Sequence, residues 1–145
     1  MIPADVKDFA MLAEYCESRL AAHGGQLEPK VTSLISIGCC QAIHNSLDGV
    51  QGAAVAEAAR FWTGAASADF EMFSKTFERR VQNDIDQGAS PEHAYKNRLV
   101  WACLNKWTDF DIVAFEYIAF FAKALGIDPV AIAQLIENAI GERPV

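Results

Sequence analysis

The sequence lacks an apolar run long enough to span a bilayer. Its longest candidate, residues 112–122, covers eleven positions and is interrupted by Glu116, whereas a transmembrane helix needs about 20 apolar residues. The first nine residues, MIPADVKDF, include Asp5 and Asp8 and lack the basic start and apolar stretch of a signal peptide. We therefore expect a protein that does not cross a membrane and resides in the cytoplasm.

Basic residues are also scarce in this chain. Twelve lysines and arginines stand against nineteen aspartates and glutamates, which gives a net charge of −7. The last part, residues 108–145, holds six acidic and only two basic side chains. Because an acidic surface repels phosphate backbones and attracts basic proteins, nucleic-acid binding is unfavoured. A basic protein is the partner that this charge predicts.

The cysteines do not form a pattern that predicts disulfides or a metal site. The four are Cys16, Cys39, Cys40 and Cys103, and all lie within segments with helical patterns. Cys40 and His44 are four residues apart and could supply two ligands from one helix face, but zinc needs three or four. We therefore interpret these cysteines as small buried side chains and expect neither a metal nor another cofactor.

Recognisable catalytic motifs are missing as well. The sequence has no nucleophile elbow, no glycine-rich phosphate loop and no paired Glu-x-x-His metal motif. The best candidate for a functional carboxylate is Glu116, because it stands alone in an otherwise apolar segment, where burial would favour its protonated form. The alternative is that Glu116 reaches solvent between neighbouring helices. We expect a protein that is not an enzyme.

Helix signals, by contrast, recur along the whole chain. Hydrophobic residues make up 52% of the 145 positions, enough for one well-packed domain. Proline and capping residues open apolar-periodic segments, and glycine closes most of them. Gly38 inside one segment predicts close approach by a neighbouring helix. The sequence predicts a single all-α domain over residues 1–145, orthogonal or bundle-like, with six to seven helices near residues 3–23, 30–48, 51–63, 68–87, 91–107, 108–125 and 130–140.

The segment 108–125, TDFDIVAFEYIAFFAKAL, is apolar around nearly its whole circumference. Its polar positions Asp109, Glu116 and Lys123 are seven residues apart, so they form one narrow line along a helix. Thr108 can cap its start and Gly126 can end it. We expect this segment to be the central helix around which the others pack.

The last two predicted helices, residues 118–138, resemble bacterial helix-turn-helix units. The residues with that spacing are Ala122, Gly126, Ile132 and Leu135. A recognition helix needs side chains that reach phosphates and base edges, yet residues 128–140 contain no basic residue and include Glu137. A structural helical hairpin is therefore the preferred interpretation, and a divergent DNA-binding regulator is the weaker one.

A tryptophan in a polar setting is the clearest sign of a binding surface. In the helix 91–107, helical spacing places Trp101 near Asn97, Arg98 and Asn105. Tryptophan and arginine are enriched at the energetic centres of protein interfaces. These four residues are the predicted interface anchor, although tryptophans of small helical proteins are often simply buried.

These observations favour a small acidic helical protein that acts by protein–protein binding. We expect an inhibitor, an immunity-type neutraliser or an adaptor of a larger, basic partner, and a homodimer is compatible with that role. The alternative is a small-ligand or regulatory domain with a pocket between helix 108–125, the Phe70–Phe73–Phe77 side chains and the Trp101–Trp107 element.

Overall fold

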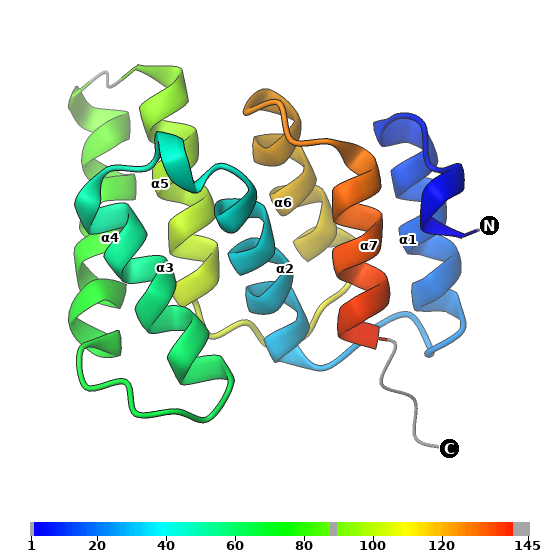
Figure 1. The fold of residues 1–145 in the computed structure, drawn as a ribbon, viewed down its shortest axis with the longest axis horizontal. Coiled ribbons are helices and arrows are strands. Elements are labelled where there is room, and N and C mark those ends of the chain that lie inside the picture. Colours follow the sequence, from blue (N-terminus) through cyan, green and yellow to red (C-terminus); the bar gives the residue numbers. More distant parts are fainter. Residues whose placement is uncertain (1, 88–89, 141–145) are drawn as a thin grey trace.

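The computed structural model describes residues 2–87 and 90–140, and these form a single all-α domain, as the sequence predicts. Figure 1 shows the helices side by side in a bundle-like row, with α4 at one end and α1 at the other. Within this described part, no helix is both long and apolar enough to cross a membrane. The helices are α1 (Phe9–Ala21), α2 (Pro29–Ala42), α3 (Gly49–Trp62), α4 (Phe70–Gln87), α5 (Pro91–Leu104), α6 (Ile112–Ala124) and α7 (Pro129–Ile140), with short 3-10 turns η1 (Pro3–Asp5) and η2 (His44–Ser46).

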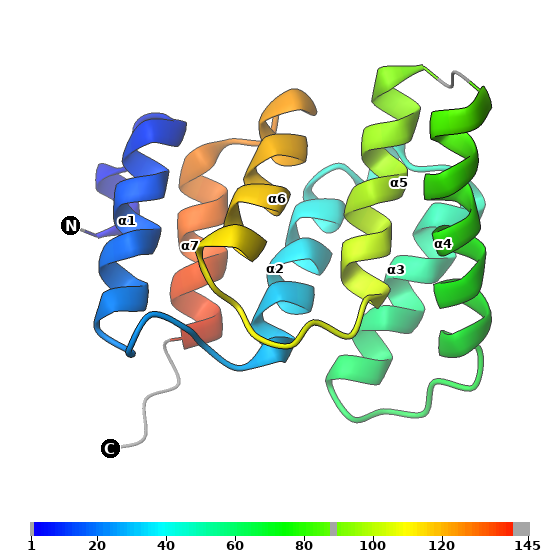
Figure 2. The same ribbon diagram turned by 180° about the vertical axis from the view of Figure 1, so that it is seen from behind.

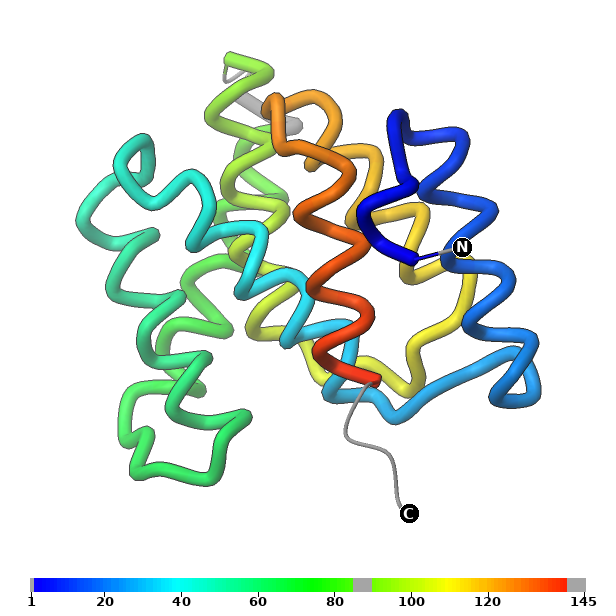
Figure 3. The backbone as a smooth tube through the Cα atoms, turned by 45° about the vertical axis from the view of Figure 1, so that its right-hand side comes forward, coloured from blue at the N-terminus to red at the C-terminus, as the bar shows by residue number. Residues whose placement is uncertain are grey.

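Helices α2 and α5 form the middle of the domain. They pack against each other; α2 also contacts α3, α6 and α7, and α5 also contacts α3, α4 and α6. Helix α7 lies along α2, as the tube in Figure 3 makes visible. Gly38 permits this approach, because a methyl group at that position would overlap the side chain of Leu135 on α7. The close helix contact predicted at Gly38 is thereby confirmed.

The predicted central helix 108–125 differs from the observed α6 in its start. The helix begins at Ile112, and the side chain of Asp111, rather than Thr108, accepts a hydrogen bond from the backbone N–H of Ala114 at 2.9 Å. The preceding residues form a loop because Phe110 pairs with Leu27 through two backbone hydrogen bonds of 2.9 and 3.0 Å. This long-range pairing holds the chain away from a helical path.

The expected burial of this helix on all sides is also wrong. Helix α6 packs against α1, α2 and α5 and lies on the near face of the domain in Figure 2. The side toward these neighbours is buried, through residues such as Phe115 and Ile118. On the opposite side Val113 is 68% exposed and Phe120 is 60% exposed. The neighbouring helices do not enclose α6, so part of its apolar circumference faces solvent.

Candidate protein-binding face

Six aromatic rings follow the line where α5 and α6 meet. We call this set the aromatic seam: Tyr95 and Trp101 of α5, Trp107 of the following loop, and Tyr117, Phe120 and Phe121 of α6. On α6 the spacing of three and four residues places the aromatic positions on adjoining sides of the helix. Helical periodicity thus accounts for the α6 side of the seam, whereas Tyr95, Trp101 and Trp107 reach it through the packing of α5 and its following loop against α6.

The rings of the seam contact one another in an unbroken series. Trp101 lies 5.6 Å from Trp107 and 5.7 Å from Tyr117, measured between ring centroids. Tyr117 lies 4.9 Å from Phe121, which lies 5.1 Å from Phe120 with the planes nearly perpendicular. Edge-to-face pairs of this kind add to the burial energy and fix ring orientation. The exposed ring of Phe120 thus stands on a rigid support.

Arg98 lies among these rings. Its guanidinium carbon is 5.7 Å from the centroid of Phe121, within the range of a cation–π interaction. Burial raises the pKa of Tyr117 to about 12, while the nearby Arg98 acts in the opposite direction. The Tyr117 phenol therefore stays neutral, and Arg98 is held in place by side chains of α6.

Trp101 is half-buried, with rings of the seam on two sides. It supports the surface from within, and Phe120 is the ring that projects from it. Asn105 ends α5: its backbone N–H donates to the carbonyl of Trp101 at 2.9 Å, and its carbonyl accepts from Ser33 at 3.4 Å. The backbone of Asn105 thus has a structural role at the helix end.

The prediction that Asn97 lies on the interface is wrong. Asn97 is completely buried, on the side of α5 that faces α3 and α4. Its side-chain carbonyl accepts from Gln51 at 2.9 Å and from Arg80 at 3.4 Å, and its amide donates to Asp84 at 2.8 Å. The reason is that α5 has neighbours on most of its circumference, so its polar positions serve different contacts.

Glu116 is exposed, so the prediction that its carboxylate is buried is wrong, and the side chain reaches solvent as in the alternative interpretation. It lies on the outward side of α6 together with Val113, Phe120 and Lys123, and we call these four residues the outer face of α6. Helical spacing explains the grouping, because positions three, seven and ten residues apart fall on one side of a helix. Within the described part of the chain, neither Glu116 nor Lys123 forms an ion pair.

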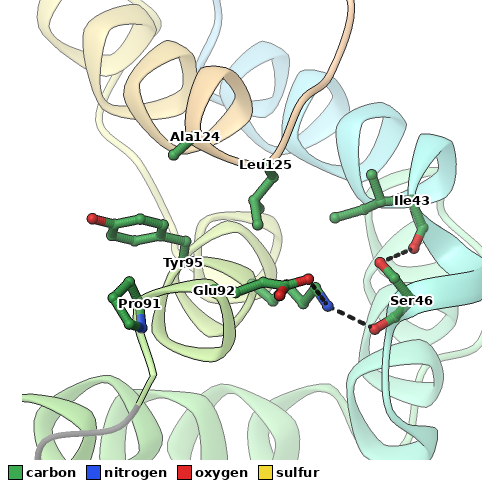
Figure 4. Close-up of a pocket in the computed structure, with 8 residues that line it drawn as sticks. Ile43, Ser46, Pro91, Glu92, Tyr95, Ala124 and Leu125 are labelled. Carbon is green, nitrogen blue, oxygen red and sulfur yellow. Dashed lines mark hydrogen bonds and ion pairs between the residues drawn. The ribbon is translucent and has the colours of Figure 1, made fainter.

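Two cavities flank the end of the seam at Tyr95. One, of about 330 Å³, is lined by seam residues together with Arg98 and Asp84. Figure 4 shows the other, of about 260 Å³, between the start of α5, the end of α6 and η2. There Lys96 donates to the carbonyl of Ser46 at 3.0 Å and pairs with Glu92 at 3.0 Å. The cation of this second cavity is therefore already engaged by the protein itself.

The side chains named for a small-ligand pocket, Phe70, Phe73 and Phe77, lie in the core or beside it. Phe70 and Phe77 are core side chains, and Phe70 stacks on Phe61 at 3.7 Å between centroids. Phe73 is half-buried and packs against that core.

The cysteines are packed as core side chains. The sulfur atoms of Cys40 and Cys103 are 3.8 Å apart and buried, whereas His44 lies exposed on η2. Burial raises the pKa of the Cys16 thiol to about 12, so this thiol is protonated at neutral pH. Among the side chains that the structure describes, no group of three or more from His, Cys, Asp or Glu is arranged to hold a metal ion.

Helix α7 is the second helix of the sequence that resembles a helix-turn-helix unit, and its exposed polar side chains, Gln134 and Asn138, are uncharged. Gln134 donates to Asn138 there at 2.9 Å. Glu137 forms an ion pair with Arg19, with 3.1 Å between the Arg19 Nε and the carboxylate, and it accepts a hydrogen bond from the Tyr15 hydroxyl. The turn at Gly126, with φ of 76°, forms as the spacing predicts, but it joins two helices of the packed bundle.

Comparison of the chain with protein-family models, with curated proteins and with solved structures found no match. Sequence reasoning found Trp101 and Arg98 of this region but did not single out Phe120, Val113 or Tyr95. Only the position of α1, α2 and α5 around α6 decides which of its apolar residues are exposed.

Proposed function

We propose that this protein is a binding domain without chemistry of its own, which docks a protein partner on the outer face of α6. The observation that carries the proposal is the exposure of two large apolar side chains on one side of this helix, 68% for Val113 and 60% for Phe120. Seven residues separate them, which is about 10 Å along a helix. Apolar side chains seven residues apart on one side of a helix have the anchor spacing with which a helix face docks on a protein partner.

The surroundings of these two side chains support the same role. Glu116 and Lys123 provide charges beside the apolar centre, an arrangement typical of protein interfaces. The aromatic seam beneath Phe120 fixes its ring, so little side-chain entropy is lost when a partner covers it. Covering the exposed parts of Phe120 and Val113 would contribute about 2–4 kcal/mol together. Phe120 has the larger side chain of the two, so it is the main anchor of this proposal.

The net charge of −7 supports a basic partner. A charge of this size attracts a basic protein over distances beyond direct contact and speeds association, most strongly at low salt. Inhibitors, immunity-type neutralisers and adaptors of larger proteins are the classes that work by such binding. Cytoplasmic residence, expected from the sequence, belongs to the same proposal.

Exchange of Phe120 for serine tests the proposal. Partners would be cross-linked and captured from the natural host, identified by mass spectrometry, and the best candidate purified for calorimetry. We expect Phe120→Ser to weaken binding by about tenfold or more, the equivalent of losing one anchoring side chain. Met72→Ser is the matched control, because Met72 is 54% exposed on α4, away from the outer face of α6. Equal binding by Phe120→Ser and wild type would contradict the proposal.

A further inference from the structure

We infer that the outer face of α6 binds a second copy of this chain, with the two α6 helices antiparallel about a twofold axis beside Phe120. The inference rests on the proposed function in one respect, that the outer face of α6 is a docking surface. It adds the identity of one partner and the orientation in which that partner binds.

The charges on the outer face are complementary to themselves. Glu116 and Lys123 are both exposed and seven residues apart on one side of α6. The midpoint between them falls between Ala119 and Phe120. A twofold axis through that midpoint places Glu116 of each copy opposite Lys123 of the other. Both pairs form at once, because an interface with this symmetry uses the same surface on each subunit.

The apolar residues fit the same arrangement. Phe120 lies next to the midpoint, so the two Phe120 rings meet at the axis. Val113 then faces position 126 of the opposite copy, where the exposed Gly126 lies just past the end of α6. The aromatic seam holds each Phe120 ring from below, so both copies present the same rigid apolar centre.

Other arrangements satisfy this surface less well. A parallel pair would place Glu116 on Glu116 and Lys123 on Lys123, which sets like charges together. A basic partner attracted by the net charge would have to place an acidic group opposite Lys123 as well as a basic one opposite Glu116. A second copy matches both charges, and while it is bound it prevents another protein from reaching Phe120. Self-association and binding of a different partner therefore compete for the same side chain.

The contact of one helix pair is small, so the dimer is expected to be weak. Interfaces below about 1,200 Å² of total buried surface are typical of transient complexes. The net charge of −7 on each copy also opposes association, and at about 0.15 M salt this long-range repulsion is screened beyond roughly 8 Å. Dimers should accordingly be present at high protein concentration and dissociate on dilution.

Charge reversal gives a decisive test by sedimentation equilibrium of the purified chain, from about 5 to about 500 µM, a range suited to weak complexes. Glu116→Lys and Lys123→Glu should each weaken the dimer about tenfold or more, because like charges then face each other. The double variant should recover wild-type association. An equimolar mixture of the two single variants should form mixed dimers, because every 116–123 contact in it joins opposite charges. Glu78→Lys, on the exposed side of α4, is the control for a change of net charge.

The inference is overturned by a wild-type protein that stays monomeric over this range. It is equally overturned by a dimer that neither single reversal weakens, or by a folded double variant that fails to recover association. These outcomes are distinct from failure of the proposed function. If the protein is a monomer but Phe120→Ser still weakens its binding to a different protein, only the dimer is refuted. If the dimer depends on charge as expected but Phe120→Ser leaves binding to the different protein unchanged, the binding of that protein through the outer face of α6 is refuted.

Discussion

The buried side chain of Asn97 makes a strong and specific prediction about stability. Asn97 is fully buried and joins Gln51 of α3, Arg80 and Asp84 of α4, and its own helix α5. Replacing Asn97 by alanine removes the acceptor for the side-chain amide of Gln51, which is only 1% exposed. An orphaned buried amide costs about 1–3 kcal/mol, in addition to the hydrogen bonds that are lost. Asp84 is half-buried and regains a partner from water, so it adds little.

We therefore expect Asn97→Ala to lower the free energy of unfolding by about 2–4 kcal/mol. Urea titration followed by circular dichroism measures this, with an unchanged slope if the unfolded state is the same. In a Gln51→Leu background the same substitution should cost at least about 1 kcal/mol less, because no amide is then orphaned. Asn138→Ala, an exposed asparagine of α7, should change stability by less than about 0.5 kcal/mol. A similarly small effect of Asn97→Ala would refute the reasoning.

Two further predictions concern packing and pH. Gly38→Ala should destabilise the protein by about 1–3 kcal/mol, because the added methyl group overlaps Leu135. In a Leu135→Ala background the same substitution should stabilise it by up to about 1 kcal/mol, because alanine favours the helix more than glycine does. A urea double-mutant cycle measures both effects, and a change in stability of the same sign in both backgrounds would contradict the Gly38–Leu135 contact. Burial alone would raise the pKa of Asp48, but the backbone N–H of Gln51 and the guanidinium of Arg80 outweigh it and hold the pKa below its ordinary value of 3.8. This contribution to stability is present above that ordinary value and is lost as the pH falls through the lowered pKa. Asp48→Asn should therefore flatten the decline of stability in acid, and an unchanged acid profile would argue against the pairing.

Much of the fold could be predicted because its helix ends are encoded locally. The Ser90–Pro91 start is observed, with the Ser90 side chain accepting from the backbone N–H of His93, and Gly126 ends α6 in a left-handed turn. The start of α6 could not be predicted, because Thr108 and Asp111 are both good capping residues. The pairing of Phe110 with Leu27, far away in the sequence, decides between them.

The candidate site was less predictable for a related reason. Trp101 and Asn97 are four residues apart, and helical spacing alone places them near each other. The helices around α5 separate them, because Asn97 meets α3 and α4 while Trp101 meets α6. Likewise, a helix that is apolar on all sides gives no sign of which side will stay exposed. Phe120 and Val113 became candidates only when the positions of α1, α2 and α5 were known.

The central claim is that the outer face of α6 is a docking surface, and partner binding by Phe120→Ser compared with Met72→Ser tests it most directly. Both exchanges remove an exposed apolar side chain, so their effects on solubility and stability should be alike. We expect Phe120→Ser to lose at least about nine-tenths of the affinity for the purified partner, and Met72→Ser to keep wild-type affinity. Equal affinity of both variants and wild type would contradict the account.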